Sequence, residues 1–333
     1  MVANDNFRTD YDMKLAVFAV DGVFDTGLTV LLDTFATANE LIEALGLSCP
    51  PFDVSCVGLS PTIRTALGLT ATVEKPEAAG KPDWVIVPAI NAKQPKALVA
   101  ALEREDLKAA FNHLRVWHEA GSGLAGACIG TFLLAEAGLL DGLEATTTWS
   151  LAPLFRQRYP QVRLDDTRMI VVSGKTVTAG AMMGHLDLAL WLVRQASPDV
   201  AALVARFMLI DKRPSQAQYM IPDHLAHADP LIQRFERWAR QNLDSRFSLQ
   251  DAANALAVTP RTLQRRSEAV LGKSPLAFLQ DIRVERAQHL IAIGHDLDRI
   301  AGEVGYADAA TLRKLLRRRL GRGVRQLRAE AAG

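Results

Sequence analysis

The first two-thirds of the chain alternates short apolar runs with longer stretches in which apolar residues recur at helical spacing. The short runs have the length and composition of buried parallel strands. Strands are predicted at 14–20, 52–58, 69–73, 84–87, 123–127, 145–148 and 170–178, and helices at 28–45, 97–120 with a break near Glu105, 130–137, 185–193 and 200–209. This alternation predicts an α/β domain with a doubly wound, mostly parallel sheet.

In the last third of the chain the apolar residues follow helical spacing alone. Ser248 and Asp251 form a capping box ahead of a helix with a small apolar inner face, and Thr259-Pro260 starts a second helix after a short turn. A similar helix, turn and helix follow around Gly305. These patterns predict an all-α domain that contains two helix-turn-helix motifs.

An apolar-periodic run at 275–293 joins the two motifs. A helix of these 19 residues spans roughly 28 Å at about 1.5 Å per residue. This length is close to the roughly 34 Å between successive major-groove faces of DNA. One chain could therefore place two recognition helices on one side of a duplex. An ordinary helical bundle with a solvated basic face is the alternative interpretation.

The formal net charge of +1 hides an asymmetry between the two parts of the chain. Residues 231–333 contain 19 Lys and Arg against 11 Asp and Glu, a net charge of +8, so residues 1–230 carry −7. A basic end beside an acidic domain is typical of a protein in which one half binds nucleic acid. Outward-facing residues of each second helix, near its N-terminus in the first motif, are the predicted DNA contacts: Arg261, Thr262, Gln264, Arg265, Arg313, Lys314 and Arg317.

The segments 259–266, 283–291 and 304–321 resemble the AraC/XylS family of transcription regulators, and the resemblance covers residues 231–328. It implies a double helix-turn-helix domain that binds promoter DNA. Six positions depart from the family pattern, where the family has a buried Phe, other aromatics, or a closing Pro and Tyr: Ser267, Leu312, Leu316, Leu320, Val324 and Leu327. These are mostly substitutions in the core, so they change packing more than DNA binding.

In the α/β domain, candidate site residues lie in the loops that follow predicted strands, at 21–27, 88–91 and 127–131. Cys128 lies at a strand-to-helix turn between small residues, as in a nucleophile elbow, where the helix N-terminus favours a thiolate. The alternative is an inert, buried cysteine.

The segments 126–142, 145–149 and 173–193 resemble the PfpI-type, glutamine-amidotransferase-like domain, and with 33–39 and 213–219 the whole chain resembles the GlxA subgroup of regulators. In the enzymatic members of the family that the chain resembles, the Cys of the elbow works with a nearby His and an acid. Here Ile129 and Thr148 stand where relatives carry His. We therefore expect no catalytic residues and a retained pocket that binds a small molecule, with walls formed by Asp25, Asn91, Cys128, Ile129 and Thr148.

The expected organisation is a ligand-sensing and dimerisation domain at 12–197, a linker at 198–230 and a DNA-binding domain at 231–330. The three cysteines, Cys49, Cys56 and Cys128, show no disulfide or zinc spacing, so we expect no metal and no cofactor. No apolar signal core and no run of about 18 apolar residues occurs, which favours a cytoplasmic protein without a membrane partner.

The sequence therefore predicts a DNA-binding transcription regulator that forms a homodimer and responds to an unknown small-molecule effector. Its predicted partner is double-stranded promoter DNA. Two alternatives stay open at this point. One is a Cys128-dependent hydrolase or amidotransferase-like enzyme with an accessory DNA-binding end, and the other is a redox sensor that acts through oxidation of Cys128.

Overall fold

The computed structural model describes residues 12–211, 213, 215–221, 229–320 and 323–332. The chain divides into two compact units. The α/β unit consists of Met1–Leu151 with Tyr159–Gln216, and the helical unit consists of Ala152–Arg158 with Ala217–Gly333.

The α/β unit is built on a six-stranded sheet with the strand order β2-β1-β5-β6-β10-β9. Neighbouring strands from β2 to β10 are parallel, and β9 pairs antiparallel with β10. The strands of the sheet are β1 (Met13–Phe18), β2 (Phe52–Val57), β5 (Trp84–Val87), β6 (Gly123–Ala127), β9 (Ile170–Ser173) and β10 (Thr176–Ala179). Two small two-stranded sheets lie outside it and comprise β3 (Thr62–Arg64) with β4 (Thr70–Thr72) and β7 (Glu144–Ala145) with β8 (Arg163–Leu164).

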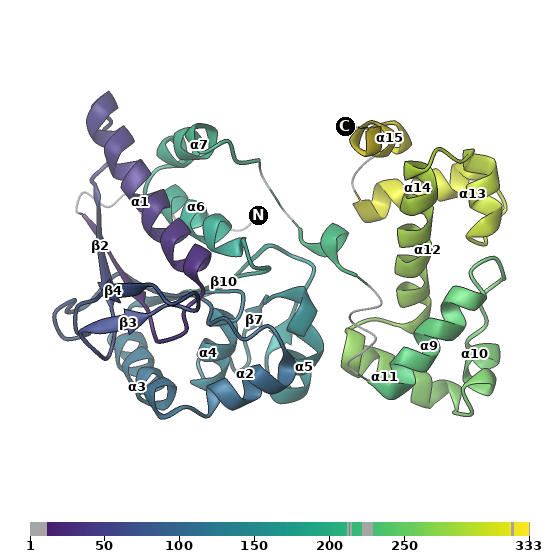
Figure 1. Cartoon of the computed structure of the whole chain (residues 1–333), viewed down its shortest axis with the longest axis horizontal. Coiled ribbons are helices and arrows are strands. Elements are labelled where there is room, and N and C mark those ends of the chain that lie inside the picture. Colours follow the sequence, from purple (N-terminus) through teal and green to yellow (C-terminus); the bar gives the residue numbers. More distant parts are fainter. Residues whose placement is uncertain (1–11, 212, 214, 222–228, 321–322, 333) are drawn as a thin grey trace. The chain divides into compact units, whose positions relative to one another are not determined.

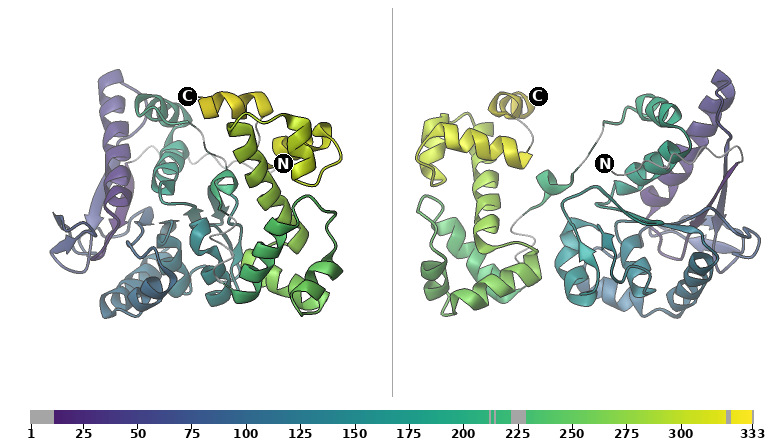
Figure 2. Two further views of the ribbon diagram at one scale, coloured as in Figure 1. Left: turned by 45° about the vertical axis from the view of Figure 1, so that its right-hand side comes forward. Right: turned by 180° about the vertical axis from the view of Figure 1, so that it is seen from behind.

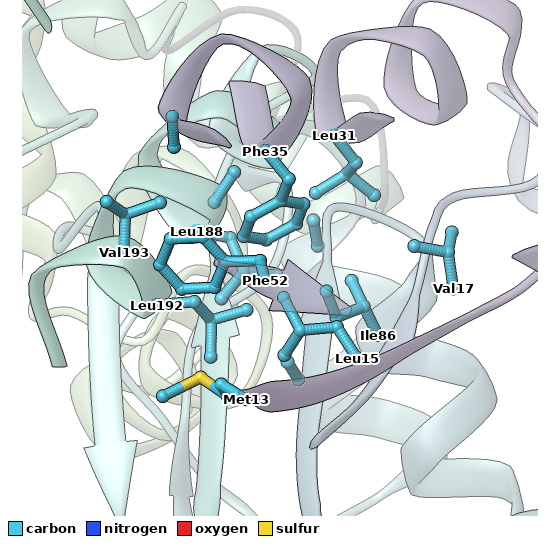
Figure 3. Packing of buried hydrophobic residues seen from close by; sticks show 14 of the residues in the cluster. Met13, Leu15, Val17, Leu31, Phe35, Phe52, Ile86, Leu188, Leu192 and Val193 are labelled. Atoms are coloured by element: carbon cyan, nitrogen blue, oxygen red, sulfur yellow. The ribbon is translucent and has the colours of Figure 1, made fainter. Parts of the chain in front are cut away.

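Helices cover both faces of the large sheet (Figure 1). They are α1 (Asp25–Leu45), α2 (Pro95–Leu102), α3 (Glu105–Glu119), α4 (Gly130–Glu136), α6 (Gly184–Ala196) and α7 (Pro198–Phe207). Leu15 and Val17 of β1 pack in one core with residues of α1, α6 and α7, among them Phe35 and Leu188 (Figure 3). On the other face, Phe18 meets the ring of Trp117 in α3 edge-on, with 5.5 Å between ring centroids. Alternate residues of β1 therefore serve two cores, which is why the strand is apolar at almost every position.

The predicted fold class is confirmed, and most predicted elements lie within a few residues of the observed ones. Two predictions of strands were wrong in detail. The run at 170–178 is a hairpin, because Gly174 has φ 60° and turns β9 back along β10. Of the strand predicted at 145–148, only Ala145 pairs, as part of β7. The side chains of the next two residues, Thr146 and Thr147, instead donate hydrogen bonds to the carbonyl oxygens of Arg168 and Cys128.

The helical unit places two helix-turn-helix motifs on one long helix. Its main helices are α9 (Pro230–Gln241), α10 (Leu249–Ala255), α11 (Pro260–Leu271), α12 (Pro275–Ala292), α13 (Leu297–Glu303), α14 (Ala309–Leu320) and α15 (Val324–Ala332). The short elements η1 (Trp149–Leu151), α5 (Ala152–Arg158) and η2 (Ala217–Tyr219) complete the described elements of the chain. Within this unit, α12 runs from α9, α10 and α11 at one end to α13, α14 and α15 at the other (Figure 1 and Figure 2).

The helices of each motif begin with side-chain caps, and of the capping box predicted at Ser248 and Asp251 the serine cap is present. The Ser248 hydroxyl accepts the Asp251 N–H at 3.2 Å, and the Thr259 hydroxyl accepts the Thr262 N–H at 3.1 Å. In the second motif, Gly305 with φ 73° makes the turn. The Asp308 carboxylate accepts the Thr311 N–H at 2.7 Å at the start of α14. These caps satisfy N–H groups that have no partner inside the helix.

A buried arginine holds the two motifs to the same helix. Arg283 of α12 is 6% exposed, and it donates to the carbonyl oxygens of Leu243 at 3.1 Å and Ser245 at 2.6 Å. Its guanidinium also lies over the ring of Tyr306, 5.3 Å from the centroid. The loop between α9 and α10 and the turn of the second motif therefore share one cation, which fixes the two motifs relative to each other.

No described helix has both the length and the apolar character needed to cross a membrane.

We expect Arg283→Met to lower the free energy of unfolding of the helical unit by about 2–4 kcal/mol, because the buried guanidinium and its hydrogen bonds to two part-buried carbonyl groups are lost. Urea unfolding of the full chain, followed by tryptophan fluorescence and circular dichroism, measures this loss. Arg286→Met on the same helix is the control, because Arg286 is 44% exposed and its nearest acid, Glu303, is 3.8 Å away. Equal effects of the two substitutions would contradict the role of Arg283.

Candidate ligand cavity and nucleic-acid interface

Cys128 occupies a strained turn between β6 and α4. Its φ is 56°, in the left-handed region that residues other than Gly rarely adopt. The turn is held by hydrogen bonds from the Cys128 N–H to Ala179 O at 2.9 Å and from the Thr147 hydroxyl to Cys128 O at 2.7 Å. A Cβ at Gly130 would lie 2.0 Å from the carbonyl oxygen of Val87, so only glycine fits beside the end of β5. The chain thus has the geometry of a nucleophile elbow.

The thiol of Cys128 is buried rather than presented to solvent. Cys128 is 5% exposed, and burial raises the pKa of its thiol to about 11. The Ile129 N–H, the Thr148 hydroxyl and the charge of Lys93 act in the opposite direction but do not offset burial. At neutral pH the group is therefore a neutral thiol, which is a poor nucleophile.

The described residues around the thiol supply no general base. Thr148 offers only a hydroxyl, and Ile129 is apolar. His185 at the start of α6 is fully buried, and burial lowers the pKa of its imidazole to about 4. Its Nδ1 lies 2.8 Å from Met182 O, so Nδ1 carries the proton, and Nε2 accepts the Ala89 N–H at 3.0 Å. Both ring nitrogens are therefore occupied by backbone groups.

A cavity of about 40 Å³ lies at this turn. Four of the five predicted wall residues, Asn91, Cys128, Ile129 and Thr148, line it. The other lining residues are Phe24, Ala89, Ile90, Lys93, Ser150, Leu151 and Met182. A volume of this size holds one or a few water-sized groups, since a single buried water needs roughly 10–15 Å³ or more. The shape therefore favours a very small ligand or a narrow part of a larger one.

Asp25, the fifth predicted wall residue, does not line the cavity. It is the first residue of α1 and is 8% exposed. Its Oδ2 accepts the Leu67 N–H at 3.0 Å, and its Oδ1 is buried without a hydrogen-bond partner among the described residues. The carboxylate thus ties the β3–β4 hairpin to the start of α1, and the expectation that it faces the pocket is corrected.

Gln216, the last residue of the α/β unit, was missed by the sequence reasoning. It is fully buried, and its amide donates to the carbonyl oxygen of Thr147 at 2.8 Å and to the Thr146 hydroxyl at 3.2 Å. Thr147 in turn bonds the carbonyl oxygen of Cys128. A chain of hydrogen bonds therefore joins the Cys128 turn to the residue at which the chain leaves this unit. Gln216 lies in the segment 213–219, which is part of the resemblance to GlxA-like regulators, but nothing in the sequence indicated that this segment reaches the pocket.

In the helical unit, the predicted contacts of the first motif lie on one end of α11. Arg261 and Arg265 are exposed, and Thr262 and Gln264 are half-buried. The Gln264 amide bonds the carboxylate of Glu268 one turn later on the same helix. Leu263 and Ser267 point to the core, and the Ser267 hydroxyl donates to Lys273 O at 2.7 Å. That bond explains how a polar residue is tolerated at this fully buried position.

The predicted contacts of the second motif, Arg313, Lys314 and Arg317, are all exposed on α14. The opposite side of this helix carries Leu312, Leu315 and Leu316, which are buried. The helical spacing of apolar residues in the sequence therefore correctly predicted the two faces of α14, one with cations and one with leucines.

One further arginine on each of α11 and α14 binds another part of the helical unit and does not face solvent alone. Arg266 donates through Nε to Asp229 at 2.5 Å, and Asp229 is 3% exposed and caps α9. Arg319 lies 3.0 Å from Asp281 and bonds Gln280 of α12 at 3.0 Å. These cations stabilise the packing of the recognition helices. By contrast, the side chains of Arg261, Arg265, Arg313, Lys314 and Arg317 form no hydrogen bond or ion pair with another described residue.

Among the described residues, no three or more His, Cys, Asp or Glu side chains are grouped so that they could hold a metal ion.

Part of the helical unit is similar to a known domain family. Residues 252–330 match a family model described as a helix-turn-helix domain. The chain is 30% identical over 183 residues to the HTH-type transcriptional regulator CdhR of Pseudomonas aeruginosa, covering 54% of each protein. It is 24% identical over 272 residues to the HTH-type transcriptional regulator GlxA of Rhizobium meliloti, covering 78% of this chain and 80% of that protein.

The chain spans about half the length of the first curated relatives that it matches. A solved structure of a putative transcriptional regulator protein from Vibrio parahaemolyticus aligns with a TM-score of 0.50 and 19% identity, covering 59% of this chain and 99% of that one. This likeness concerns the fold alone. Together, the matches confirm the predicted resemblance to GlxA-like regulators and to their AraC-type helix-turn-helix domain.

We expect the Cys128 thiol to react with iodoacetamide at least about 100-fold more slowly at pH 8 than a free thiol, whose pKa is near 8.5. The fraction of thiolate is small because the pKa is about 11, and burial slows access further. Mass spectrometry of peptides from the full chain, sampled over time and pH, measures the rate. Rapid labelling below pH 8 would show a stabilised thiolate and would contradict this account of the turn.

Proposed function

We propose that the chain is a sequence-specific DNA-binding transcription regulator whose α/β unit senses a small molecule without catalysing a reaction. One observation supports this function most directly: two helix-turn-helix motifs share α12, and each presents exposed cations on its second helix. A double motif of this kind has no evident use in an enzyme. The matched regulators support the same conclusion, since their names describe HTH-type transcriptional regulators.

The geometry of the helical unit suits two major-groove contacts. Helix α12 has 18 residues and spans about 27 Å at 1.5 Å per residue. Since Arg283 ties both motifs to this helix, their spacing is held rather than variable. We infer that α11 and α14 enter successive major-groove faces, which are roughly 34 Å apart.

Base contacts and phosphate contacts can be assigned to different residues. On α11, Arg261 and Arg265 are exposed and can donate in pairs to guanine, while Thr262 and Gln264 can bond other base edges. On α14, Arg313, Lys314 and Arg317 form a cationic face that suits phosphate oxygens as well as bases. The net charge of +8 on residues 231–333 adds attraction that is independent of sequence.

The small cavity at Cys128 supports a sensor better than an enzyme. The neutral thiol, the hydroxyl of Thr148 and the occupied ring of His185 leave the elbow without a base. Hydrolase, amidotransferase and thiol-redox roles all need a reactive thiolate, and its raised pKa opposes each of them. Asn91, Cys128, Ile129 and Thr148 remain our proposed ligand contacts.

A ligand signal has a physical route out of the α/β unit. Gln216 is hydrogen-bonded to Thr147, which bonds the Cys128 turn, and the chain continues from Gln216 into the helical unit. A ligand that stabilises one arrangement of this turn would shift the population of arrangements of the following segment. We propose a homodimer, because two copies double the contacted DNA, and we place the protein in the cytoplasm with its DNA.

We expect Arg265→Ala to weaken binding to the preferred duplex by about 1–3 kcal/mol and to relax discrimination at one base pair. The duplex is obtained by selection from a random library with the unmodified chain, and affinities are measured by fluorescence anisotropy. Arg299→Ala is the control, since Arg299 is 67% exposed but lies on α13 and pairs with Glu303. Unchanged preference for the selected duplex over a scrambled one would refute the assigned role of Arg265.

We expect Lys314→Ala to weaken binding to selected and scrambled duplexes equally, because a phosphate contact carries no sequence information. The logarithm of the affinity should fall linearly with the logarithm of salt concentration, and the substitution should reduce that slope by about one. Titrations at several salt concentrations with both duplexes measure the change. A slope identical to that of the unmodified chain would show that Lys314 lies off the DNA.

A further inference from the structure

A second cavity in the α/β unit is much larger than the one at Cys128. Its volume is about 300 Å³, against about 40 Å³ at the elbow. The walls come from β9, α6, the end of α7 and the segment after it, and consist of Arg168, Met169, Ile170, Asp187, Leu190, Trp191, Arg194, Ala205, Ile210, Asp211 and Arg213. We call it the α6–α7 cavity. Its volume is within the range of sites that enclose small organic ligands, roughly 300–1,000 Å³.

The polar part of this cavity is centred on an incompletely satisfied arginine. Arg213 donates to Asp187 Oδ2 at 2.6 Å, and its Nε is buried without an acceptor among the described residues. Asp187 is only 12% exposed at its side chain, and burial raises its pKa to about 6 although Arg213 lowers it. A buried donor without a partner is costly, so an incoming acceptor would be favoured here.

Cations also outnumber anions at the rim. Arg168 and Arg194 are both exposed, and neither guanidinium has a hydrogen bond or ion pair to another described residue. Asp211 is the remaining charged group of the lining. With the Asp187–Arg213 pair neutral as a unit, the rim keeps one net positive charge, which favours an anion. Guanidinium groups bind carboxylates through two parallel hydrogen bonds.

The rest of the lining is apolar and partly aromatic. Trp191 is half-buried, and its ring meets Trp84 edge-on at 5.5 Å, which holds the indole in place. Met169, Ile170 and Leu190 complete this side. A rigid aromatic wall beside free guanidinium groups suits a ligand that has a flat or apolar body and one anionic end.

We propose that the α6–α7 cavity binds a small organic carboxylate with an apolar body at a site separate from the Cys128 cavity, and that this molecule is a second effector of the regulator. The carboxylate lies among Arg168, Arg194 and Arg213, and the body packs on Trp191. This proposal adds a ligand class to the proposed function. Binding of the carboxylate does not depend on that function, whereas its effect on DNA binding does.

The position of this cavity in the chain explains how its occupancy would reach the helical unit. One wall is formed by Ala205, Ile210 and Arg213. Leu209 has φ 54°, which ends α7, and the Ile210 N–H donates back to Ala205 O at 2.8 Å. Three residues after Arg213 the chain reaches Gln216, the last residue of the α/β unit. A ligand that binds Arg213 therefore contacts the part of the chain that leads to Gln216.

The test is calorimetric titration of the full chain with benzoate, and with benzamide as an uncharged molecule of nearly the same shape. We expect benzoate to bind at least about tenfold more tightly than benzamide, a difference of about 1.4 kcal/mol. Arg194→Gln and Arg168→Gln should each weaken benzoate binding severalfold without weakening benzamide binding. Arg163→Gln is the matched control, because Arg163 is 66% exposed, pairs loosely with Glu144 and does not line the cavity.

Another substitution is expected to strengthen benzoate binding. Asp187→Asn removes the carboxylate that competes for Arg213, so benzoate should bind severalfold more tightly. Absence of benzoate binding, or equal binding of benzoate and benzamide, would overturn the proposal. So would benzoate binding that is unchanged in the Arg168, Arg194 and Asp187 variants.

The link to regulation is measured separately by the affinity for the selected duplex with and without saturating benzoate. A change of at least about threefold that disappears in Arg194→Gln supports an effector site. Unchanged duplex affinity would overturn the effector role while the titrations still establish the carboxylate site. A chain that selects no duplex at all would instead contradict the proposed function, which distinguishes the two failures.

Discussion

Parallel strand pairing is the constraint on which the candidate chemistry of the α/β unit depends. Because β1, β5, β6 and β10 run in the same direction, their carboxyl ends meet at one edge of the sheet. This edge brings together the loop after β5, the turn at Cys128 and the start of α6, which are far apart in sequence. The hydrogen bond between Ala89 and His185 joins two of these loops directly. The cavity, the neutral imidazole and the buried thiol are all consequences of this convergence.

Much of the α/β fold could be predicted because buried parallel strands leave a strong apolar signal. The runs at β1, β5 and β6 were located within a few residues, and so were the long helices. Site residues were harder, because a loop position does not reveal side-chain direction. Asn91 and Thr148 face the cavity, whereas Asp25 turns to the backbone of Leu67. The larger α6–α7 cavity was not predicted at all, since it combines an edge strand with residues beyond α7.

In the helical unit, sequence spacing located both motifs and the faces of α11 and α14. It could not separate arginines that face solvent from those that hold the unit together. Arg265 and Arg266 are neighbours in a basic run, but Arg266 pairs with the nearly buried Asp229, 37 positions earlier. Arg283 was grouped with an ordinary linker helix, although its partners come from loops on both sides of α12. Such long-range pairs have no local signature.

The strained backbone at Cys128 has a consequence for how such domains change over evolution. A left-handed residue other than Gly costs of order 1–3 kcal/mol, and here it is maintained by Gly130 packed on Val87 and by bonds to Thr147 and Ala179. None of these supports requires a reactive thiol. A lineage can therefore gain or lose a catalytic base at the neighbouring positions by single substitutions while the elbow stays intact. An elbow of this shape marks ancestry, and only the residues around it mark chemistry.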